Sequence, residues 1–480
     1  MDNFIFYNPT RLIFGKGMIA QLSQQIPANK RIMITFGGGS VKTNGVYEQV
    51  IQALEGRDYT EFWGIESNPD ISTLKKAIES GKEKNIDFLL AVGGGSVIDG
   101  TKLISAGIPY DGDAWELVKK GSAQNTIPLG TVLTIPATGS EMNNGAVISC
   151  RETHEKYPFF SSHPVFSILD PTVTFSLPDY QIACGLADTF VHVMEQYMTK
   201  TNESYLMDRW SESILRTLVQ IAPQIKENKQ DYHLMSEFMM SATMALNGFI
   251  AMGVSEDWAT HMIGHELTAL HGMTHGQTLA IVFPGTLRTL ADKKRDKILQ
   301  YGERIWGVTS GVPSVRVSLT IEKTEEFFRN LGLKTRLDEA GIGDDTIEEI
   351  VRRFNERGAA YGEDGDVTGE VARRILQNCK SKKETTDTGF CRIANNISKT
   401  FNIRRKQMMK TVILTSFKSD VRAHMLQDLL KNEGIESMLQ GEYTAQVLAY
   451  IPGMEIKVLV FEKDYARAFE ILKASFPEKV

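Results

Sequence analysis

The first 180 residues alternate short apolar runs with stretches of helical periodicity, and this alternation limits the possible folds most strongly. The runs RIMITF (31–36), FLLAV (88–92) and PLGTVLTIP (128–136) have the length of buried strands, and helix-like stretches follow the first two at 41–54 and 98–106. Strands separated by helices pair in parallel, because each helix carries the chain back to the edge where the previous strand began. We therefore predict a doubly wound α/β domain over residues 1–180.

The region from about Asp179 to Lys380 has a different pattern. Amphipathic stretches such as IACGLADTFVHVMEQYM and ESILRTLVQIAPQI repeat their apolar residues with helical spacing. We predict an all-α domain over residues 181–387. A polar and then basic segment without apolar periodicity follows, and it predicts a linker over residues 388–408.

A small third unit is predicted over residues 409–480. The apolar runs TVILTSF and MEIKVLVF alternate with the helix-like stretches VRAHMLQDLLKNEGI and YARAFEILKASF. Gly434 stands where the first of these helices would stop. This order predicts a compact α+β domain of ferredoxin-like type.

Composition argues against several classes of protein. The 480 residues include 53 Lys and Arg against 59 Asp and Glu, so a large basic face for nucleic acid is not expected. The four cysteines form no CxxC pair, which suits a reducing compartment. The chain begins without a secretory signal, and its longest uncharged stretch, 267–287, is too polar for a membrane span. We expect a cytoplasmic protein with neither nucleic-acid nor membrane partners.

Two copies of Gly-Gly-Gly-Ser follow apolar runs, at 37–40 and 93–96. Glycines let the backbone approach a phosphate, and the free N–H groups of a following helix favour an anion. One such copy is more often an ordinary turn, but two copies at strand ends favour a bound phosphate. Neither copy matches the GxGxxG fingerprint. A third turn, 136–140, could be a simple turn or could hold a pyrophosphate or nicotinamide.

Histidines gather in the segment WATHMIGHELTALHGMTHGQ, which holds four of the nine in the chain. Asp188 and His192 are spaced i and i+4, so they share one helix face, and His261 and His265 have the same spacing. His275 is too far along a straight helix to join them, and it requires a break, which is easiest at Gly272 or Gly276.

Each of these histidines alone would be read as an ordinary core or surface residue. Five of them around one acidic residue favour a metal site, and the oxygen and nitrogen donors suit Zn²⁺ or Fe²⁺. The nearby HELTALH does not have the HExxH spacing, which argues against a metalloprotease.

Taken together, these residues resemble the metal-dependent (iron-type) alcohol dehydrogenases, most closely the butanol dehydrogenase and broad-range aldehyde reductase branch. The resemblance covers about 1–385 and rests on GGGSVKTNGVYEQV, AVGGGSVIDGTK, TIPATGSEMN, ILDPTVTFSLP and WATHMIGHELTALHGMTHGQTLAIV. It implies an N-terminal dinucleotide-binding α/β domain and a helical metal-binding domain, in the dehydroquinate synthase-like architecture, with the active site between them.

The resemblance also assigns roles by position. It implies four metal ligands, a histidine that assists proton transfer, and cofactor contacts in the glycine turns. The implied ligands are Asp188, His192, His261 and His275, and the proton-transfer residue is His265. The implied cofactor residues are Gly37, Gly38, Gly39, Ser40, Gly94, Gly95, Ser96, Asp99, Thr138, Ser140 and Lys156.

The implied reaction moves a hydride between NADP(H) and a short-chain aldehyde or primary alcohol, with one Fe²⁺ or Zn²⁺ ion per site. NADPH is expected in preference to NADH, because an Asp of NAD-preferring relatives is replaced by Gly39, with Ser40 beside it and Lys42 nearby. A homodimer is common in the family. A dehydroquinate-synthase-like lyase, a glycerol-dehydrogenase-like enzyme and a non-catalytic sensor remain as alternatives.

The tail resembles the small signal-transducing domains of bacteria over about 410–475. Every implied ligand precedes it, and Met408-Met409-Lys410 reads like an independent start. We expect the tail to be dispensable for catalysis, as an appended domain more than as a regulator of the active site.

Overall fold

The computed structural model describes residues 1–201, 203–381, 411–417, 420–440 and 456–479. It divides into two compact units, Met1–Lys382 and Lys383–Val480, which are described separately. The predicted linker 388–408 and Cys391 lie outside the described residues.

A parallel sheet forms the first half of the first unit, and the prediction of a doubly wound α/β fold is confirmed. The sheet has the order β1-β8-β5-β4-β2-β3, and Ile34 of β2 pairs with Leu90 of β4. Its strands are β1 (Arg11–Phe14), β2 (Ile32–Phe36), β3 (Tyr59–Phe62), β4 (Phe88–Gly93), β5 (Leu129–Leu133) and β8 (Phe166–Leu169).

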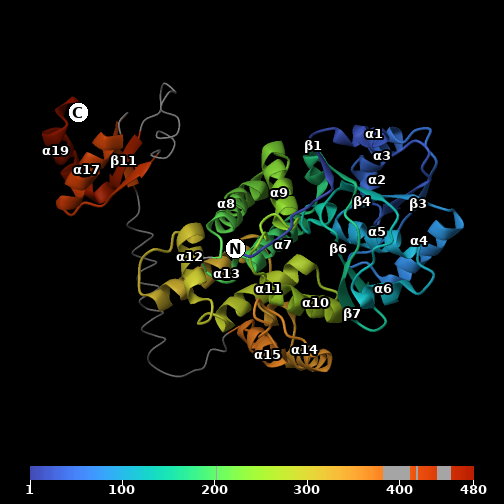
Figure 1. Ribbon diagram of the computed structural model, residues 1–480. Helices are drawn as coiled ribbons and strands as arrows, with labels where there is room; N and C mark the ends of the chain where they lie inside the picture. Colours follow the sequence, from blue (N-terminus) through green and yellow to red (C-terminus); the bar gives the residue numbers. More distant parts are fainter. Residues whose placement is uncertain (202, 382–410, 418–419, 441–455, 480) are drawn as a thin grey trace. The chain divides into compact units, whose positions relative to one another are not determined.

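Helices cover both faces of this sheet (Figure 1). Ile32, Ile34 and Phe36 of β2 pack into one apolar cluster, and Met33 packs into the other, as expected when alternate side chains point to opposite faces. The first cluster is covered by η1 (Met18–Gln21), α1 (Leu22–Gln25), α2 (Ser40–Thr43) and α3 (Val46–Ala53). The second is covered by α4 (Ile71–Glu83), α5 (Gly95–Gly107) and α6 (Ala114–Lys120).

The helices after β2 and β4 therefore leave the sheet on opposite faces. In open α/β sheets, ligands bind at the carboxyl ends of strands where the connections diverge in this way. Both Gly-Gly-Gly-Ser turns lie at this point, because β2 and β4 are paired neighbours.

Two features of this region differ from the sequence prediction. The helix expected over 41–54 is interrupted at Gly45, which has a φ of 78° and separates α2 from α3. An antiparallel hairpin of β6 (Gly145–Cys150) and β7 (Glu155–Phe160) was not predicted. Its strands are only partly buried and carry Gly, Ser, Glu and Lys, so they lack a continuous apolar run.

The second half of the first unit is built from helices, which confirms the all-α prediction. They are α7 (Asp179–Tyr197), α8 (Tyr205–Glu227), α9 (Tyr232–Ala245), α10 (Ala259–His271), α11 (His275–Thr289), α12 (Arg295–Trp306), α13 (Pro313–Asn330), α14 (Asp344–Arg357) and α15 (Gly369–Asn378). The main core of these helices is a cluster around Phe190, Phe238 and Phe328. Further short 3₁₀ turns of the first unit are η2 (Ser140–Met142), η3 (Pro171–Ser176) and η4 (Asp338–Ala340).

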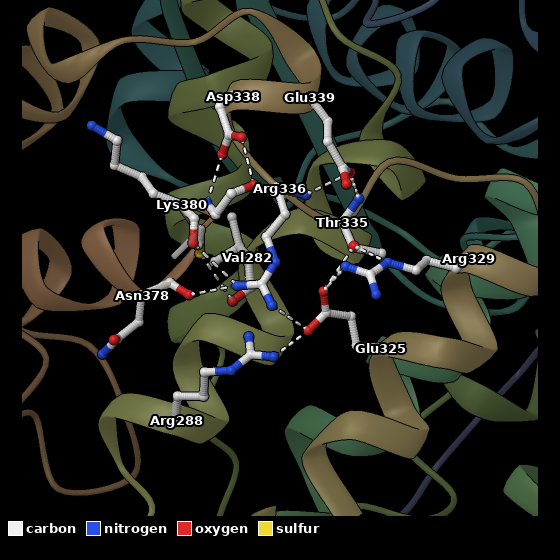
Figure 2. A network of polar contacts seen from close by, with 12 residues as sticks. Val282, Arg288, Glu325, Arg329, Thr335, Arg336, Asp338, Glu339, Asn378 and Lys380 are labelled. Atoms are coloured by element: carbon white, nitrogen blue, oxygen red, sulfur yellow. Dashed lines mark hydrogen bonds and ion pairs between the residues drawn. The ribbon is translucent and has the colours of Figure 1, made fainter. Parts of the chain in front are cut away.

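A polar network holds the C-terminal end of the first unit in place (Figure 2). The buried carboxylate of Glu325 receives the guanidinium groups of Arg288, Arg329 and Arg336. Arg336 also donates to the carbonyl oxygens of Asn378 and Lys380, at 3.2 and 3.3 Å. The first unit is thus anchored up to Lys380, before the tail begins.

The second unit is the small α+β domain that the sequence predicts, and its described strands and longer helices follow one another in the order β-α-β-β-α. Its elements are β9 (Thr411–Phe417), α17 (Asp420–Asn432), β10 (Ser437–Gln440), β11 (Ile456–Phe461), η5 (Glu462–Asp464), α19 (Tyr465–Ser475) and η6 (Pro477–Lys479). The antiparallel sheet has the order β10-β11-β9, and Gly434 ends α17 with a φ of 70°. Among the described residues of both units, no helix is long and apolar enough to cross a membrane.

Candidate active site

One face of α7 supplies a carboxylate, an imidazole and a second carboxylate. Asp188, His192 and Glu195 are spaced i, i+4 and i+7, so they lie above one another on the helix. All three are at least 96% buried, although this helix is otherwise lined by apolar side chains. Polar groups buried among apolar ones require partners.

The partners come from α10 and α11, which are joined by a sharp turn. Gly272 ends α10 with a φ of 66°, and α11 starts three residues later at His275. The predicted chain reversal between His261 and His275 is therefore present, and it occurs at Gly272. Gly276 lies inside α11, where its lack of a side chain lets the helix approach the backbone of Cys184 on α7.

The three implied histidine ligands converge on a carboxylate oxygen of the fourth, Asp188. Asp188 Oδ1 lies 3.6 Å from His192 Nε2, 3.9 Å from His261 Nε2 and 3.7 Å from His275 Nε2. Donor atoms of Asp188, His261 and His275 all lie within 4.8 Å of one another. The His192 ring stacks on the His261 ring with centroids 4.6 Å apart.

These separations are too long for hydrogen bonds and suit donors that share an ion. Asp188 Oδ1 and His261 Nε2 are buried and have no hydrogen-bond partner among the described residues. A carboxylate and neutral imidazoles are the donors expected around Zn²⁺ or Fe²⁺. The chain thus offers a divalent cation a site that fits its chemistry.

Glu195 is a site residue that the sequence reasoning missed. Its Oε1 lies 3.2 Å from His261 Nδ1 and accepts the His261 backbone N–H at 3.0 Å. The carboxylate thereby turns His261 Nε2 toward Asp188, as carboxylates behind metal-binding histidines usually do. The i+7 spacing from Asp188 on the same helix face was the available signal.

The charges of the cluster are strongly coupled. Burial favours the neutral form of Asp188, but His192, His275 and His261 outweigh it and hold its pKa well below the ordinary value. Burial lowers the pKa of His192 to about 4 and also lowers that of His275. Burial opposes protonation of His261 as well, but Asp188 and Glu195 raise its pKa. The Asp188 carboxylate is therefore ionised and carries a negative charge that a cation would neutralise.

His265 lies beside the four implied ligands, and His271 does not. The His265 ring is buried, with its centroid 5.0 Å from that of His275. Burial and then Lys156 lower the pKa of His265 far below its ordinary value, so the ring is neutral. The exposed His271 instead has its Nε2 3.0 Å from Thr346 Oγ1, which is the ordinary role of a surface histidine.

The glycine turns offer open backbone at the switch point of the sheet. Side chains added at Gly38 or Gly39 would meet nothing within 4 Å, and Gly39 has a φ of 103°. Gly94 caps α5, which starts at Gly95, so the unpaired N–H groups of its first turn face the same end of the sheet. A side chain at Gly95 would collide with Thr138, which brings the third turn against the second.

The third turn is held by buried polar contacts. Thr138 Oγ1 accepts the N–H of Ser140 at 3.2 Å, and the hydroxyl of Ser140 donates to Asp99 Oδ1 at 2.5 Å. Thr189 on α7 lies 3.4 Å from the carbonyl oxygen of Ala137. The turn therefore links the cofactor-binding half to the helix that carries Asp188.

Lys156 on β7 bridges the two halves of the site. Its Nζ donates to Asn68 Oδ1 at 2.9 Å, and Asn68 N donates to Ser96 Oγ at 3.3 Å in the second glycine turn. Burial lowers the pKa of Lys156 to about 8, while Asp99 and Asp188 raise it. Asn68 was also missed by the sequence reasoning, and it has no motif that marks it.

Models of known protein families match both halves of the first unit and also the tail. The family model described as "Iron-containing alcohol dehydrogenase" matches residues 9–171, and "Fe-containing alcohol dehydrogenase family, C-terminal" matches 182–364. The tail, 409–475, matches a family described as "Putative prokaryotic signal transducing protein".

The chain aligns with similar proteins over nearly the whole length of those proteins. The chain is 47% identical to the NADPH-dependent aldehyde reductase YqhD of Escherichia coli, over 78% of this chain and 99% of the relative. It is 43% identical to NADP-dependent alcohol dehydrogenase 3 of Entamoeba histolytica, over 77% and 97%. It is 41% identical to the probable NADH-dependent butanol dehydrogenase 1 of Bacillus subtilis, over 78% and 99%.

Solved structures superpose on the first unit. The substrate- and cofactor-free aldehyde reductase YqhD from Escherichia coli matches with a TM-score of 0.73 at 46% identity, over 79% of this chain and 100% of that chain. The NADH-dependent butanol dehydrogenase A from Thermotoga maritima matches with a TM-score of 0.76 at 34% identity, over 79% and 99%. The resemblance seen in the sequence is confirmed, and the lyase and sensor alternatives are set aside. The chain belongs to the iron-containing alcohol dehydrogenase family, and it is an NAD(P)-dependent alcohol dehydrogenase or aldehyde reductase that carries a small C-terminal domain.

Proposed function

We propose that this chain is an aldehyde reductase that prefers NADPH and uses one divalent ion, Fe²⁺ or Zn²⁺, held by Asp188, His192, His261 and His275. The observation that carries the proposal is the convergence of three imidazole nitrogens to within 3.9 Å of one carboxylate oxygen. Short-chain aldehydes, and primary alcohols in the reverse direction, are the substrates.

A bound ion supplies a Lewis acid for the carbonyl oxygen, and a bound nicotinamide supplies the hydride. The chain itself orients and shields these groups. Glu195 fixes the ring of His261, and the apolar packing around α7 excludes water from the ligands. His265, neutral and buried next to His275, is placed to relay a proton to the alcohol oxygen, because one ring nitrogen can take up a proton from water as the other gives one.

The pyrophosphate of the cofactor is assigned to the glycine turns. The residues of the first turn, Gly37 to Ser40, contact the adenosine part of the cofactor. Gly94, Gly95 and Ser96, at the start of α5, bind its phosphates. Thr138 faces them from the third turn, and the buried Lys156 lies close enough to Asp99 and to Asp188 for both carboxylates to raise its pKa.

The preference for NADPH rests on the charges around the first turn. The exposed Lys42 places its Nζ 4.1 Å from the centroid of the Trp63 ring, next to the open backbone of Gly39. Glu61, at the end of the neighbouring strand, accepts hydrogen bonds from Tyr47 and Trp63, so its carboxylate is engaged. A cation therefore lies beside this turn for a 2′-phosphate, and the Glu61 carboxylate is bonded to other partners.

A homodimer and a cytoplasmic location complete the proposal. Near the N-terminus, Ile5 is 97% exposed and Tyr7 is 77% exposed, and Phe4 and Phe6 lie between or beside them. Contiguous apolar exposure of this kind is typical of a surface that another protein covers. Light scattering of the purified chain tests the assembly, and a mass of one chain would contradict it.

The catalytic proposal is tested by NADPH consumption over a panel of short aldehydes, with metal analysis of the same sample. Aldehyde-dependent oxidation of NADPH, faster than that of NADH at equal concentrations, is expected. A higher kcat/KM with NADH on the same aldehyde would refute the cofactor preference, and an absence of turnover with every metal tested would refute the reaction.

A further inference from the structure

The geometry points to Lys102 as a positioning residue for the cofactor: through Ser140 and Asp99, it holds the turn 136–140 against the start of α5. Lys102 lies on α5, two turns after the second glycine turn, and its side chain is completely buried. It ends the motif AVGGGSVIDGTK, but it was assigned no role from the sequence. The inference rests on the proposed cofactor site.

The ammonium group of Lys102 uses all of its donors. Nζ donates to Ser140 Oγ at 2.8 Å, to Asn143 Oδ1 at 3.0 Å and to the carbonyl oxygen of Gly145 at 2.6 Å. A charged lysine has three N–H donors and a neutral one has two, so only the cation satisfies this set. The three acceptors lie in the third turn, the segment after it and the start of β6.

Asp99 completes the arrangement from the same helix. Its Oδ1 accepts the hydroxyl of Ser140 at 2.5 Å, and its Oδ2 accepts the N–H of Val147 at 2.9 Å. The Ser140 hydroxyl thus donates to an anion and accepts from a cation, and Ser140 is only 2% exposed. Its hydrogen is committed to Asp99, so Ser140 acts on the cofactor through the position of the turn.

Thr138 connects the position of the third turn to the proposed cofactor site. Thr138 packs against Gly95, and its Oγ1 is bonded to the backbone of Ser140. From the opposite side, Asn143 Nδ2 donates to the carbonyl oxygen of Leu246 at the end of α9. With Lys102 removed, the turn keeps this outer contact and the bond from Ser140 to Asp99, but it loses the cation that joins Ser140, Asn143 and Gly145 to α5.

The test is a double-mutant cycle on the dissociation constant of NADPH, measured by fluorescence quenching with the full chain. Lys102→Met and Ser140→Ala are each expected to weaken binding by about tenfold, and the double variant by about tenfold instead of the hundredfold of independent sites. A Lys102→Met enzyme that binds NADPH within twofold of the wild type, or effects that multiply, would overturn the inference.

Lys297→Met is the matched control, because Lys297 is also buried and ion-paired, to Asp208 at 2.6 Å, but lies among the helices of the second half. It should lower the thermal midpoint and leave NADPH binding unchanged. If Lys102→Met does not fold, the cycle of Asp99→Asn with Ser140→Ala replaces it, with the same expected non-additivity. If the wild type itself does not bind NADPH, the proposed cofactor site fails, whatever the variants do.

A pH profile separates positioning from simple stability. Burial lowers the pKa of Lys102 to about 8, while Asp99 and Glu141 raise it, and His163 is the other titratable group that senses its charge. Above this pH the amine loses a donor, so NADPH binding by the wild type should weaken. Because Lys156 titrates in the same range, the comparison is made with Lys102→Met, whose profile should be flatter; identical profiles would contradict the role of Lys102.

Discussion

The two units of this chain bury different kinds of side chain. In the first unit, Asp188, His192, His261 and His265 are buried together, and each has a polar side-chain atom without a hydrogen-bond partner among the described residues. In the described part of the second unit every buried side chain is apolar, as with Phe417, Leu426 and Val458. Burying unpaired polar groups costs free energy, so they persist where function requires them. This difference indicates that the chemistry belongs to the first unit, whereas the second unit has an apolar core of its own.

Removing a metal ligand should have the largest effect. His261→Ala and His275→Ala are each expected to lose most bound metal and to reduce kcat by more than about 100-fold, since loss of a ligand should exceed the effect of a residue behind it. Metal analysis and turnover of the folded variants check this. His271→Ala, which alters the same helix outside the cluster, should retain both, and a full metal equivalent in either ligand variant would contradict the assignment.

Loss of the Glu195 charge should have an intermediate effect. Glu195→Gln keeps the shape but weakens the orientation of His261, so metal affinity should fall by about tenfold, at the lower end of the range for such residues. The measurement is metal release to a chelator. Glu212→Gln removes another buried carboxylate, bonded to Tyr197 and Arg304, and should not change metal affinity. Equal metal affinities of Glu195→Gln and the wild type would show that Glu195 has no such role.

Coenzyme preference should respond to Lys42. Lys42→Met is expected to lower kcat/KM with NADPH by several-fold, and by up to about tenfold, or 1.4 kcal/mol, while the value with NADH changes little. Steady-state kinetics with both coenzymes on one aldehyde measures this. Lys84→Met, which removes a lysine bonded to Thr60 on β3, is the control. A parallel loss with both coenzymes would mean that Lys42 does not read the 2′-phosphate.

Removal of the tail should have the smallest effect. Truncation after residue 400 leaves the anchor formed by Arg336, Asn378 and Lys380, so kcat and KM should stay within tenfold of the full chain. The thermal midpoint of the first unit should also be retained. A larger loss of activity would show that the small domain contributes to the active enzyme.

Sequence patterns predicted the parts of the fold that rest on periodicity and turns. Buried strands such as Ile32–Phe36 are continuous apolar runs, and the helices of the second half are amphipathic, so local composition carries the signal. The hairpin of β6 and β7 has no such signal, because neighbouring elements stabilise it. Gly45 breaks a helical pattern that is otherwise regular, which shows that a single left-handed residue can override periodicity.

In the candidate site, too, the sequence indicates some residues by their type and spacing, whereas others are found only from contacts between distant segments. Asp188, His192, His261 and His275 are chemically conspicuous in the sequence. The need for a helix break indicated Gly272 or Gly276, and the structure has the break at Gly272. Their meeting at one oxygen, and the contacts of Glu195, Asn68 and Lys102, depend on distances between segments far apart in the chain. Lys102 ends the motif AVGGGSVIDGTK, but its contacts cannot be predicted from the sequence, because its three acceptors follow it by about 40 residues.

The most direct test of the central claim is a metal titration of the stripped, full-length protein, followed by aldehyde-dependent oxidation of NADPH. The account predicts that activity rises with added Fe²⁺ or Zn²⁺ and saturates at one equivalent per chain, and that His275→Ala shows no rise over the same range. Undiminished reduction by the metal-free protein, or the same titration curve for His275→Ala, would contradict it.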